Sequence, residues 1–506
     1  MKILSGMASG MVMQRDPGTN ECDIHVRLAA MGDLRVTYKL RNALEPKGFL
    51  EPKGSLEPKG SLERQSTCKA QSALESRVSV GALTVEGDDR YRLRGIPCGG
   101  PYTVTISDSA EEVTLQEVYV GDVWLLAGQS NMEGAGLLTE REETYERNPE
   151  ADVRAFYLDD HWGVAEAQLH QQWKHADWAI AGLYIRTREN SPWKEGVPQR
   201  PQRDGVGPGL SIGRTMKRYM GVPQGLIPCA FGGSDLKSWA PDKTEAAAFY
   251  PAMLRRFAAC GSNVRGLFWY QGEAETNEES AGTYVETMKE LFAAVRKDTG
   301  KPDLPIVLFQ IGANALPGYG TEKSGRLWSR IREIQRTLPE QIKELDVVAT
   351  IDLPRDDSIH LSAAAAHQAG YRGAHAMYAL CGGNVLPMPQ LAGITIEPDP
   401  VKYFWGNLLI RYQNLNGRLI SHGNVSGFSV ALDEKWVYTE PYRDILSIWL
   451  EGDIVRVRTK LTCEQLKNAY LWYGAGLSSV CTITDSEDLS LPAMGPIPVR
   501  AYLQYQ

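Results

Sequence analysis

The chain has 506 residues, of which 43% are hydrophobic and 23% charged, and its formal net charge is −8 at pH 7. This length exceeds what one hydrophobic core usually supports, so we expect two or three domains. The negative charge argues against nucleic acid or an anionic membrane as a partner, and no apolar run is long enough to span a bilayer. The eight cysteines are scattered without a Cys-x-x-Cys pair, which predicts reduced thiols in a cytoplasmic protein.

The first predicted domain, residues 1–117, is β-rich, because its short runs alternate apolar and polar residues with period two. The clearest runs are 23–28, 34–40, 78–85 and 102–106. Glu-Pro-Lys-Gly occurs three times with a period of six, at 45–48, 51–54 and 57–60. Proline excludes a central strand and glycine favours a turn, so we interpret this repeat as a surface loop rather than a recognition arm.

In the second predicted domain, residues 118–388, strands alternate with helices, which is typical of a parallel sheet covered by helices on both faces. Strands are predicted at 118–126, 226–231, 264–270, 306–311 and 346–351. Helices are predicted at about 209–220, 245–260, 279–298, 324–337 and 362–380. From residue 389 to 506 the chain returns to β patterning, which predicts a third, C-terminal β-rich domain of sandwich or jelly-roll-like type.

Four of these strands are followed by side chains that a serine esterase needs. Ser130 follows the first strand, Gly233 the second and Gln271 the third, and Asp357 and His360 follow the last. Ligands of parallel sheets bind at the carboxyl ends of the strands. An aspartate three residues ahead of a histidine can bend back to its ring and hold one tautomer while the other nitrogen faces a serine. Each feature alone is common in turns, but together they predict a nucleophile, oxyanion donors and a base with its orienting carboxylate.

The same positions carry a resemblance to a known family, the sialate O-acetylesterase and acetylxylan-esterase-like branch of the SGNH (GDSL-type) hydrolases. The similar blocks are Val-Gly-Asp-Val-Trp at 120–124, Gly-Gln-Ser-Asn-Met-Glu at 128–133, Gly-Gly-Ser-Asp-Leu-Lys-Ser-Trp at 232–239, Trp-Tyr-Gln-Gly-Glu at 269–273 and Asp-Ser-Ile-His-Leu at 357–361. The resemblance implies a three-layer, flavodoxin-like parallel α/β domain flanked by two β-rich regions, both expected to be sandwiches or jelly-roll-like.

The resemblance also implies roles for single residues. Ser130 would be the nucleophile, His360 the base and Asp357 its orienter, with Asp356 as a lesser candidate. The oxyanion hole would combine the backbone N–H groups of Ser130 and Gly233 with the side chain of Gln271. Contacts with substrate are expected from Gln129, Asn131, Glu273 and Trp239, although support of the neighbouring loop is the safer expectation for Glu273. Neither a metal nor a cofactor is implied.

The expected activity is removal of acetyl groups from acetylated carbohydrates, such as xylo-oligosaccharides. Leu361 follows the histidine where many sialate O-acetylesterases have proline, which favours the acetylxylan-esterase-like subgroup. Two alternatives stay open: a sialate-specific 9-O-acetylesterase, and a carbohydrate-binding protein with a vestigial site. The sequence also leaves open which hydroxyl is deacetylated and how many copies of the chain associate.

Residues 159–193 contain further candidates. Three histidines follow Asp159 and Asp160, and we expect them to form hydrogen bonds rather than to bind a metal, because no His-Glu-x-x-His pattern is present. They are His161, His170 and His175. Four tryptophans could either stack on sugar rings or pack this long segment against the domain. They are Trp162, Trp173, Trp178 and Trp193.

Overall fold

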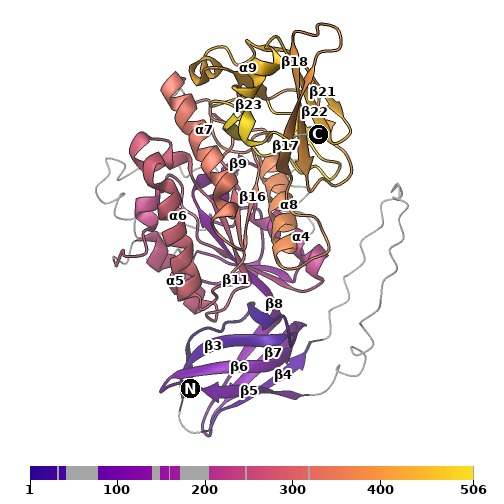
Figure 1. Ribbon diagram of the computed structural model, residues 1–506. Helices are drawn as coiled ribbons and strands as arrows, with labels where there is room; N and C mark the ends of the chain where they lie inside the picture. Colours follow the sequence, from indigo (N-terminus) through magenta and orange to yellow (C-terminus); the bar gives the residue numbers. More distant parts are fainter. Residues whose placement is uncertain are drawn as a thin grey trace.

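A computed structural model describes residues 1–30, 33–41, 78–138, 149–158, 160–170, 204–244, 248–316 and 320–504. The Glu-Pro-Lys-Gly repeat, His175, Trp173, Trp178 and Trp193 lie outside these residues. Figure 1 shows three stacked parts: an N-terminal β unit, a central sheet covered by helices, and a C-terminal β unit at the opposite end of the molecule. None of the helices within the described residues is long and apolar enough to cross a membrane.

The N-terminal unit is a closed barrel. Its strands are β1 (Lys2–Ser5), β2 (Val12–Asp16), β3 (Glu21–Ala29), β4 (Arg35–Leu40), β5 (Ser79–Val85), β6 (Arg90–Pro97), β7 (Gly99–Ser107) and the long β8 (Glu112–Gly128). Pairing runs β2-β3-β6-β5-β4-β7-β8 and returns to β2, and β1 pairs with β3. The expected sandwich or jelly roll is therefore wrong for this unit, because β8 is long enough to pair with β7 and then with β2, which closes the ring.

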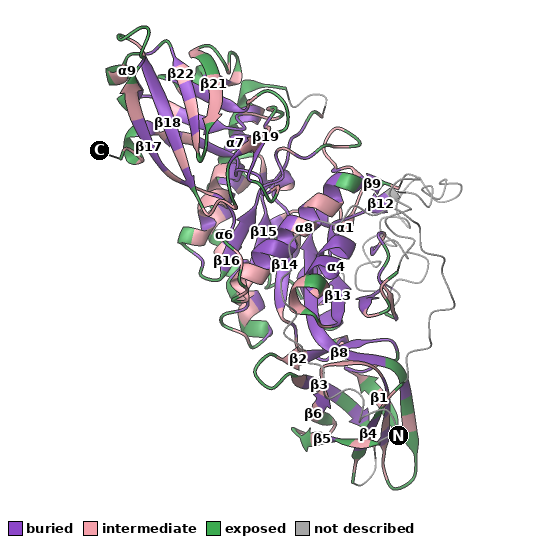
Figure 2. Ribbon diagram, turned by 90° about the vertical axis from the view of Figure 1, so that its right-hand side faces the viewer, coloured by how far each residue is buried: buried purple, intermediate pink, exposed green. Residues whose placement is uncertain are grey.

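The second half of β8 is the central strand of a parallel sheet. The sheet continues with β10 (Val153–Phe156), β13 (Gln224–Pro228), β14 (Gly266–Tyr270), β15 (Ile306–Phe309) and β16 (Leu345–Val348). Its order is β10-β13-β8-β14-β15-β16, all parallel, and β11 (Trp162–Val164) adds an antiparallel edge. The strands are apolar on both faces, as expected for a sheet covered on both sides, and Figure 2 shows them buried.

Among the described residues, five long helices cover this sheet, and all five were predicted from the sequence. They are α4 (Gly209–Met220), α5 (Phe249–Ala259), α6 (Glu278–Asp298), α7 (Glu322–Thr337) and α8 (Ala363–Leu380). In Figure 1, α5, α6 and α7 lie on one face and α4 and α8 on the other. The expected mixed α/β fold is thus confirmed.

The C-terminal unit contains two sheets over one shared core. The larger has the order β17 (Gln390–Pro398), β18 (Gly406–Gln413), β22 (Ile454–Thr459) and β21 (Ile445–Glu451), and the smaller the order β20 (Phe428–Ala431), β23 (Tyr470–Tyr473) and β25 (Met494–Pro498). Apolar side chains from both sheets form one cluster, which also contains Ala313 and Ile351 from the loops after β15 and β16. The C-terminal unit therefore packs on the carboxyl edge of the parallel sheet (Figure 1).

Shorter elements complete the described structure. They are α1 (Ser130–Glu133), α9 (Cys463–Lys467), β9 (Gly136–Leu137), β12 (Asp204–Val206), β19 (Ile420–Ser421), β24 (Ile483–Thr484), and the 3₁₀ turns η2 (Leu236–Trp239), η3 (Glu273–Glu275), η4 (Leu338–Glu340), η5 (Glu434–Tyr438) and η6 (Val499–Ala501). The first of these, α1, directly follows β8 and begins with the serine singled out above.

Candidate active site

Ser130 stands where β8 turns into α1. Gly128, the last residue of the strand, has φ 128°, and a Cβ there would lie 2.1 Å from the carbonyl oxygen of Tyr270 on β14. Only glycine permits this close approach of two backbones. The chain then turns at Gln129, and the first helical residue is Ser130, whose N–H lies outside the intrahelical hydrogen bonds. The serine is thus presented at the carboxyl edge of the sheet.

Asp357 and His360 lie on a compact turn after β16. Ser362 N donates to the Pro354 carbonyl at 3.1 Å, and the side chain of Ser362 then caps α8, so the turn is fixed at its end. Within it, Asp357 Oδ1 accepts hydrogen bonds from the backbone N–H groups of Ile359 and His360, both at 2.7 Å. This Asx-type arrangement folds the aspartate back over its own turn.

The turn brings three side chains into a chain of hydrogen bonds. His360 Nε2 lies 3.0 Å from Ser130 Oγ, and His360 Nδ1 lies 2.6 Å from Asp357 Oδ2. A carboxylate on Nδ1 selects the tautomer whose Nε2 can accept the serine proton. Asp356, the lesser candidate, points elsewhere: its Oδ2 accepts a hydrogen bond from Leu137 N at 2.7 Å. The geometry is that of a serine nucleophile with a base and an orienting carboxylate.

The hydrogen bonds around Asp357 keep its carboxyl ionised. Partial burial acts to raise the pKa of Asp357, but the Ile359 N–H, the His360 ring and the His360 N–H outweigh it, so the pKa lies below its ordinary value. A carboxylate that stays charged can stabilise an imidazolium formed on its neighbour. The side chain of His360 is 26% exposed, so the pair is open to a substrate.

The loop after β13 lies directly against the serine. A Cβ on Gly232 would lie 3.6 Å from the Cβ of Ser130. The next residue, Gly233, is exposed, has φ 73°, and has open space where a Cβ would be. Backbone N–H groups in such a glycine turn beside a helix start can receive a developing oxyanion. The structure therefore places the glycine turn against Ser130 at Gly232, and the Gly233 N–H stays a predicted oxyanion donor.

Asn131 and Glu273 form a buried pair behind the turn. Asn131 Oδ1 accepts from Leu361 N at 3.0 Å, and Asn131 Nδ2 donates to Glu273 Oε1 at 2.9 Å. Burial raises the pKa of Glu273, and the hydrogen bond from Asn131 only partly offsets this. Both side chains are more than nine-tenths buried. We therefore correct the expected substrate contact: this pair fastens the His360 turn to the start of α1.

Three further expectations need the same correction. The Gln271 amide is fully buried and its Nε2 already donates to Glu275 Oε1 at 2.9 Å and to the Ser234 carbonyl at 3.4 Å, so it is not an oxyanion donor in this arrangement. Trp239 is fully buried and its Nε1 donates to Ser234 Oγ at 2.9 Å, so it does not reach substrate. Gln129 is buried, and its Oε1 accepts the N–H of Gly272 at 3.4 Å. All three support the loops around Ser130.

Two of the three histidines after residue 159 lie in the described structure, and neither joins this cluster. His170 is fully buried and accepts the N–H of Ala230 at 3.2 Å, and burial together with the charge of Arg256 lowers its pKa to about 3. The His161 ring stacks on Tyr157. Trp162 is 6% exposed and packs into the core, as one of the two expectations had it. No group of three His, Cys, Asp or Glu side chains among the described residues could hold a metal ion.

Comparison with known proteins identifies the family. The model of the family described as "Carbohydrate esterase, sialic acid-specific acetylesterase" matches residues 120–379, which is more than half of the chain. The chain belongs to this family. The match begins inside β8 and ends near the end of α8, so it contains all residues of the cluster around Ser130. The resemblance noted in the sequence is thereby confirmed.

Relatives of this esterase family are similar to parts of the chain. A probable carbohydrate esterase of Arabidopsis thaliana is 29% identical over 174 residues, which are 33% of this chain and 61% of that protein. The human sialate O-acetylesterase is 23% identical over 214 residues, 35% of this chain and 37% of the enzyme. The chain thus matches less than two thirds of the length of either relative. A carbohydrate acetylesterase from Xanthomonas citri has a similar fold, with a TM-score of 0.64, 17% identity and coverage of 97% of this chain and 98% of that one.

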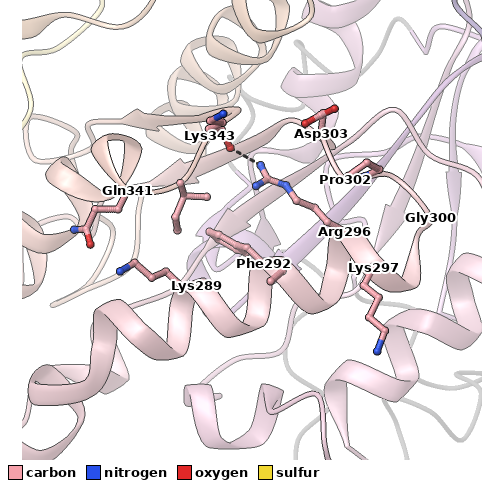
Figure 3. A pocket seen from close by; sticks show the side chains of 11 residues that line it. Lys289, Phe292, Arg296, Lys297, Gly300, Pro302, Asp303, Gln341 and Lys343 are labelled. Carbon is pink, nitrogen blue, oxygen red and sulfur yellow. Dashed lines mark hydrogen bonds between the residues drawn. The ribbon is translucent and has the colours of Figure 1, made fainter.

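A large cavity lies far from this cluster, at the amino edge of the parallel sheet. It has a volume of about 660 Å³ and lies between the end of α6 and the segments that precede β15 and β16. Its charged side chains do not converge: Figure 3 shows the ammonium groups of Lys289 and Lys297 pointing apart, and Arg296 donates to the Lys343 carbonyl at 2.6 Å. This cavity therefore offers no organised polar site.

Residues that support the loops of the site without belonging to the Ser130 cluster were not predicted from the sequence. Glu275 accepts both the Gln271 amide and the N–H of Leu236 at 2.7 Å, which ties two loops together. Arg332 on α7 is fully buried and donates to the carbonyls of Gly474, Gly476 and Leu477 in the C-terminal unit. Glu275 could have been suspected, because it lies two residues after the predicted Gln271–Glu273 block. Arg332 gives no local signal for this contact, because its partners in the C-terminal unit are more than 140 residues away.

Proposed function

We propose that this protein is a carbohydrate O-acetylesterase that removes acetyl groups from acetylated sugars, such as xylo-oligosaccharides, through an acetyl-enzyme intermediate. The observation that carries the proposal is the continuous hydrogen-bonded path from Ser130 Oγ through the His360 ring to Asp357. Membership of the carbohydrate esterase family supports the chemistry, and the exposed Gly233, next to the Gly232 that lies against Ser130, supports acyl transfer in particular.

The reaction follows from these groups. His360 Nε2 takes the proton of Ser130 as the oxygen attacks the acetyl carbonyl, and the N–H groups of Ser130 and Gly233 face the new oxyanion. The intermediate collapses, the sugar oxygen leaves with the proton held on His360, and the acetyl group stays on Ser130. Water then attacks, giving its proton to His360, and acetate leaves as the serine regains its proton. One oxyanion donor is typically worth about 3 kcal/mol of transition-state stabilisation.

The finer assignments belong to the same proposal. We place the central domain in the SGNH (GDSL-type) superfamily with a flavodoxin-like sheet, supported by the order β13-β8-β14-β15-β16, which is 2-1-3-4-5 when these strands are numbered along the chain. We also keep three domains, divided at 388/389 and at 117/118, where the boundary falls inside the shared strand β8. The unpaired cysteines among the described residues support the cytoplasmic location that we propose. We expect neither nucleic acid nor membrane as a partner.

A sialate-specific 9-O-acetylesterase is the second candidate, favoured by the family description and by the similarity to sialate O-acetylesterases. The test is release of acetate from acetylated xylo-oligosaccharides and, in parallel, from O-acetylated sialic acid, by the wild type and Ser130→Ala. Release that disappears in the variant supports the esterase, and the faster substrate decides between the two candidates. Release that survives Ser130→Ala contradicts Ser130 as the nucleophile, and no release from either substrate contradicts the esterase and favours a carbohydrate-binding protein with a vestigial site.

A further inference from the structure

A smaller cavity lies beside the catalytic turn, between the parallel sheet and the C-terminal unit. Its volume is about 240 Å³, which is below the ~300–1,000 Å³ typical of pockets for drug-sized ligands and suits one ring rather than a chain. One wall is the segment after β16, which includes Arg355 and Asp357, and the other is the C-terminal segment 478–481. The cavity thus starts at the carboxylate that holds His360.

The position of this cavity matters because of where the sugar must lie during the proposed reaction. The oxygen that leaves has to be within hydrogen-bond reach of His360 Nε2, since that nitrogen returns the proton. The leaving sugar therefore lies beside the His360 ring, and Asp357 lies on the opposite side of that ring, 2.6 Å from Nδ1. A cavity lined by Asp357 is consequently one imidazole ring away from the reacting oxygen.

The polar groups in the cavity suit hydroxyl groups better than an anion. Arg355 donates from Nη1 to the Ser358 carbonyl at 2.7 Å and from Nη2 to Ser478 Oγ at 3.2 Å, which leaves other N–H groups of the guanidinium for a ligand. Asp352 and Asp357 line the same cavity. Arg372 already donates to both oxygens of Asp352, at 2.8 and 2.7 Å, so Asp357 is the acid that a carboxylate ligand would meet beside Arg355. A neutral diol can instead donate to this carboxylate and accept from the arginine and serine groups.

The C-terminal wall is held firmly enough to take part in recognition. The fully buried Arg332 donates to the carbonyls of Gly474 at 3.0 Å, Gly476 at 2.6 Å and Leu477 at 3.2 Å. Asn314 N, in the loop after β15, donates to the same Leu477 carbonyl at 2.9 Å. Segment 474–477 is therefore fixed just before Ser478, so the serine is presented from a preorganised loop.

We propose that this cavity is a subsite for a neutral sugar ring of the substrate, and that segment 478–480 of the C-terminal β unit recognises hydroxyl groups of that ring together with Arg355. The inference rests on the proposed esterase function and adds a specificity-determining contribution from outside the family-matched residues. The C-terminal unit then forms part of the substrate-binding site.

The test compares two esters by the same acetate-release assay. Acetylated xylo-oligosaccharides reach the cavity, whereas the two-carbon leaving group of ethyl acetate is too short to do so, and the readout is the ratio of their kcat/KM values. Ser478→Ala removes one hydroxyl and is expected to lower this ratio about three- to tenfold. Val480→Trp, at a lining residue that is 65% exposed, fills the cavity and is expected to lower the ratio about tenfold or more. Ser447→Ala, on β21 and away from the cavity, is the matched control and should leave the ratio unchanged.

The outcomes separate the inference from the function on which it rests. If Ser130→Ala abolishes hydrolysis of both esters but Ser478→Ala and Val480→Trp leave the ratio at the wild-type value, the subsite is wrong and the esterase stands. If hydrolysis of ethyl acetate survives Ser130→Ala, the esterase proposal itself fails. If the two cavity variants impair O-acetylated sialic acid and spare the xylo-oligosaccharides, the neutral-sugar assignment is overturned in favour of a carboxylate ligand.

Discussion

The variant Asn131→Ala tests whether Asn131 positions the His360 turn or binds substrate directly. The side chain makes two buried hydrogen bonds, to Leu361 N at 3.0 Å and to Glu273 Oε1 at 2.9 Å. Loss of the first leaves a buried N–H without a partner, and loss of both is expected to reduce the free energy of unfolding by about 2–4 kcal/mol. Because Leu361 directly follows His360, the turn loses its tie to α1.

The catalytic effect follows from that tie. A misplacement of about 1 Å in a catalytic group can cost roughly 100-fold in rate, so kcat for acetate release is expected to fall by about that factor while KM changes little. Steady-state kinetics and urea unfolding of the same preparation measure both effects. Glu273→Gln is the matched control: it keeps an oxygen acceptor for Asn131 in a side chain of the same shape, so it should remain close to the wild type. If Asn131→Ala has an unchanged kcat and a raised KM, Asn131 does not position the turn, and the expectation that it binds substrate directly holds instead.

Three further predictions test other parts of the structure. Asp357→Asn places an amide beside Nδ1 and favours the wrong tautomer, so kcat should fall by about 10⁴ with the fold intact by circular dichroism; a loss below tenfold would argue against Asp357 as orienter. Arg332→Met removes the buried donor of the Gly474 and Gly476 carbonyls and should lower the free energy of unfolding by about 3 kcal/mol or more, whereas an unchanged thermal midpoint would show that this tie is dispensable. Burial raises the pKa of Asp346 from 3.8 to about 6, so the native state holds this proton more tightly than the unfolded chain, and stability is lost as the pH rises from 4 to 6, by about 3 kcal/mol for about two pH units. Asp346→Asn should remove that part of the pH dependence in urea unfolding, and an unchanged slope would contradict the assignment.

The sequence predicted those features that depend on local pattern. Hydrophobic periodicity located α4 and α8 to within a residue, because each helix buries one continuous face. The Asp-x-x-His spacing predicted that Asp357 bends back to His360, because the turn itself fixes that geometry. The serine at the end of β8 was predictable in the same way, since the strand ends at a glycine that must approach β14 closely.

What could not be predicted depends on contacts between distant segments. The direction of the Gln271 side chain is decided by Glu275 and by the loop that contains Ser234, not by its place at a strand end. Closure of the barrel requires β2 to pair with β8, more than 100 residues later. The hydrogen bonds of Arg332 to the C-terminal unit cross a similar separation. Tertiary packing determines these contacts, and they produce no periodic pattern in the sequence.

The long strand β8 couples the stability of the barrel to that of the catalytic sheet, because both contain it. Its first half pairs with β7, and its second half pairs with β13 and β14 and ends two residues before Ser130. Side chains from the barrel and from one face of the sheet also form a single apolar cluster. Local opening of the barrel would therefore loosen the strand that presents the serine, and amide hydrogens on both halves of β8 should exchange with solvent at similar rates. A chain cut at residue 118 would lose the strand partners on which this anchorage depends.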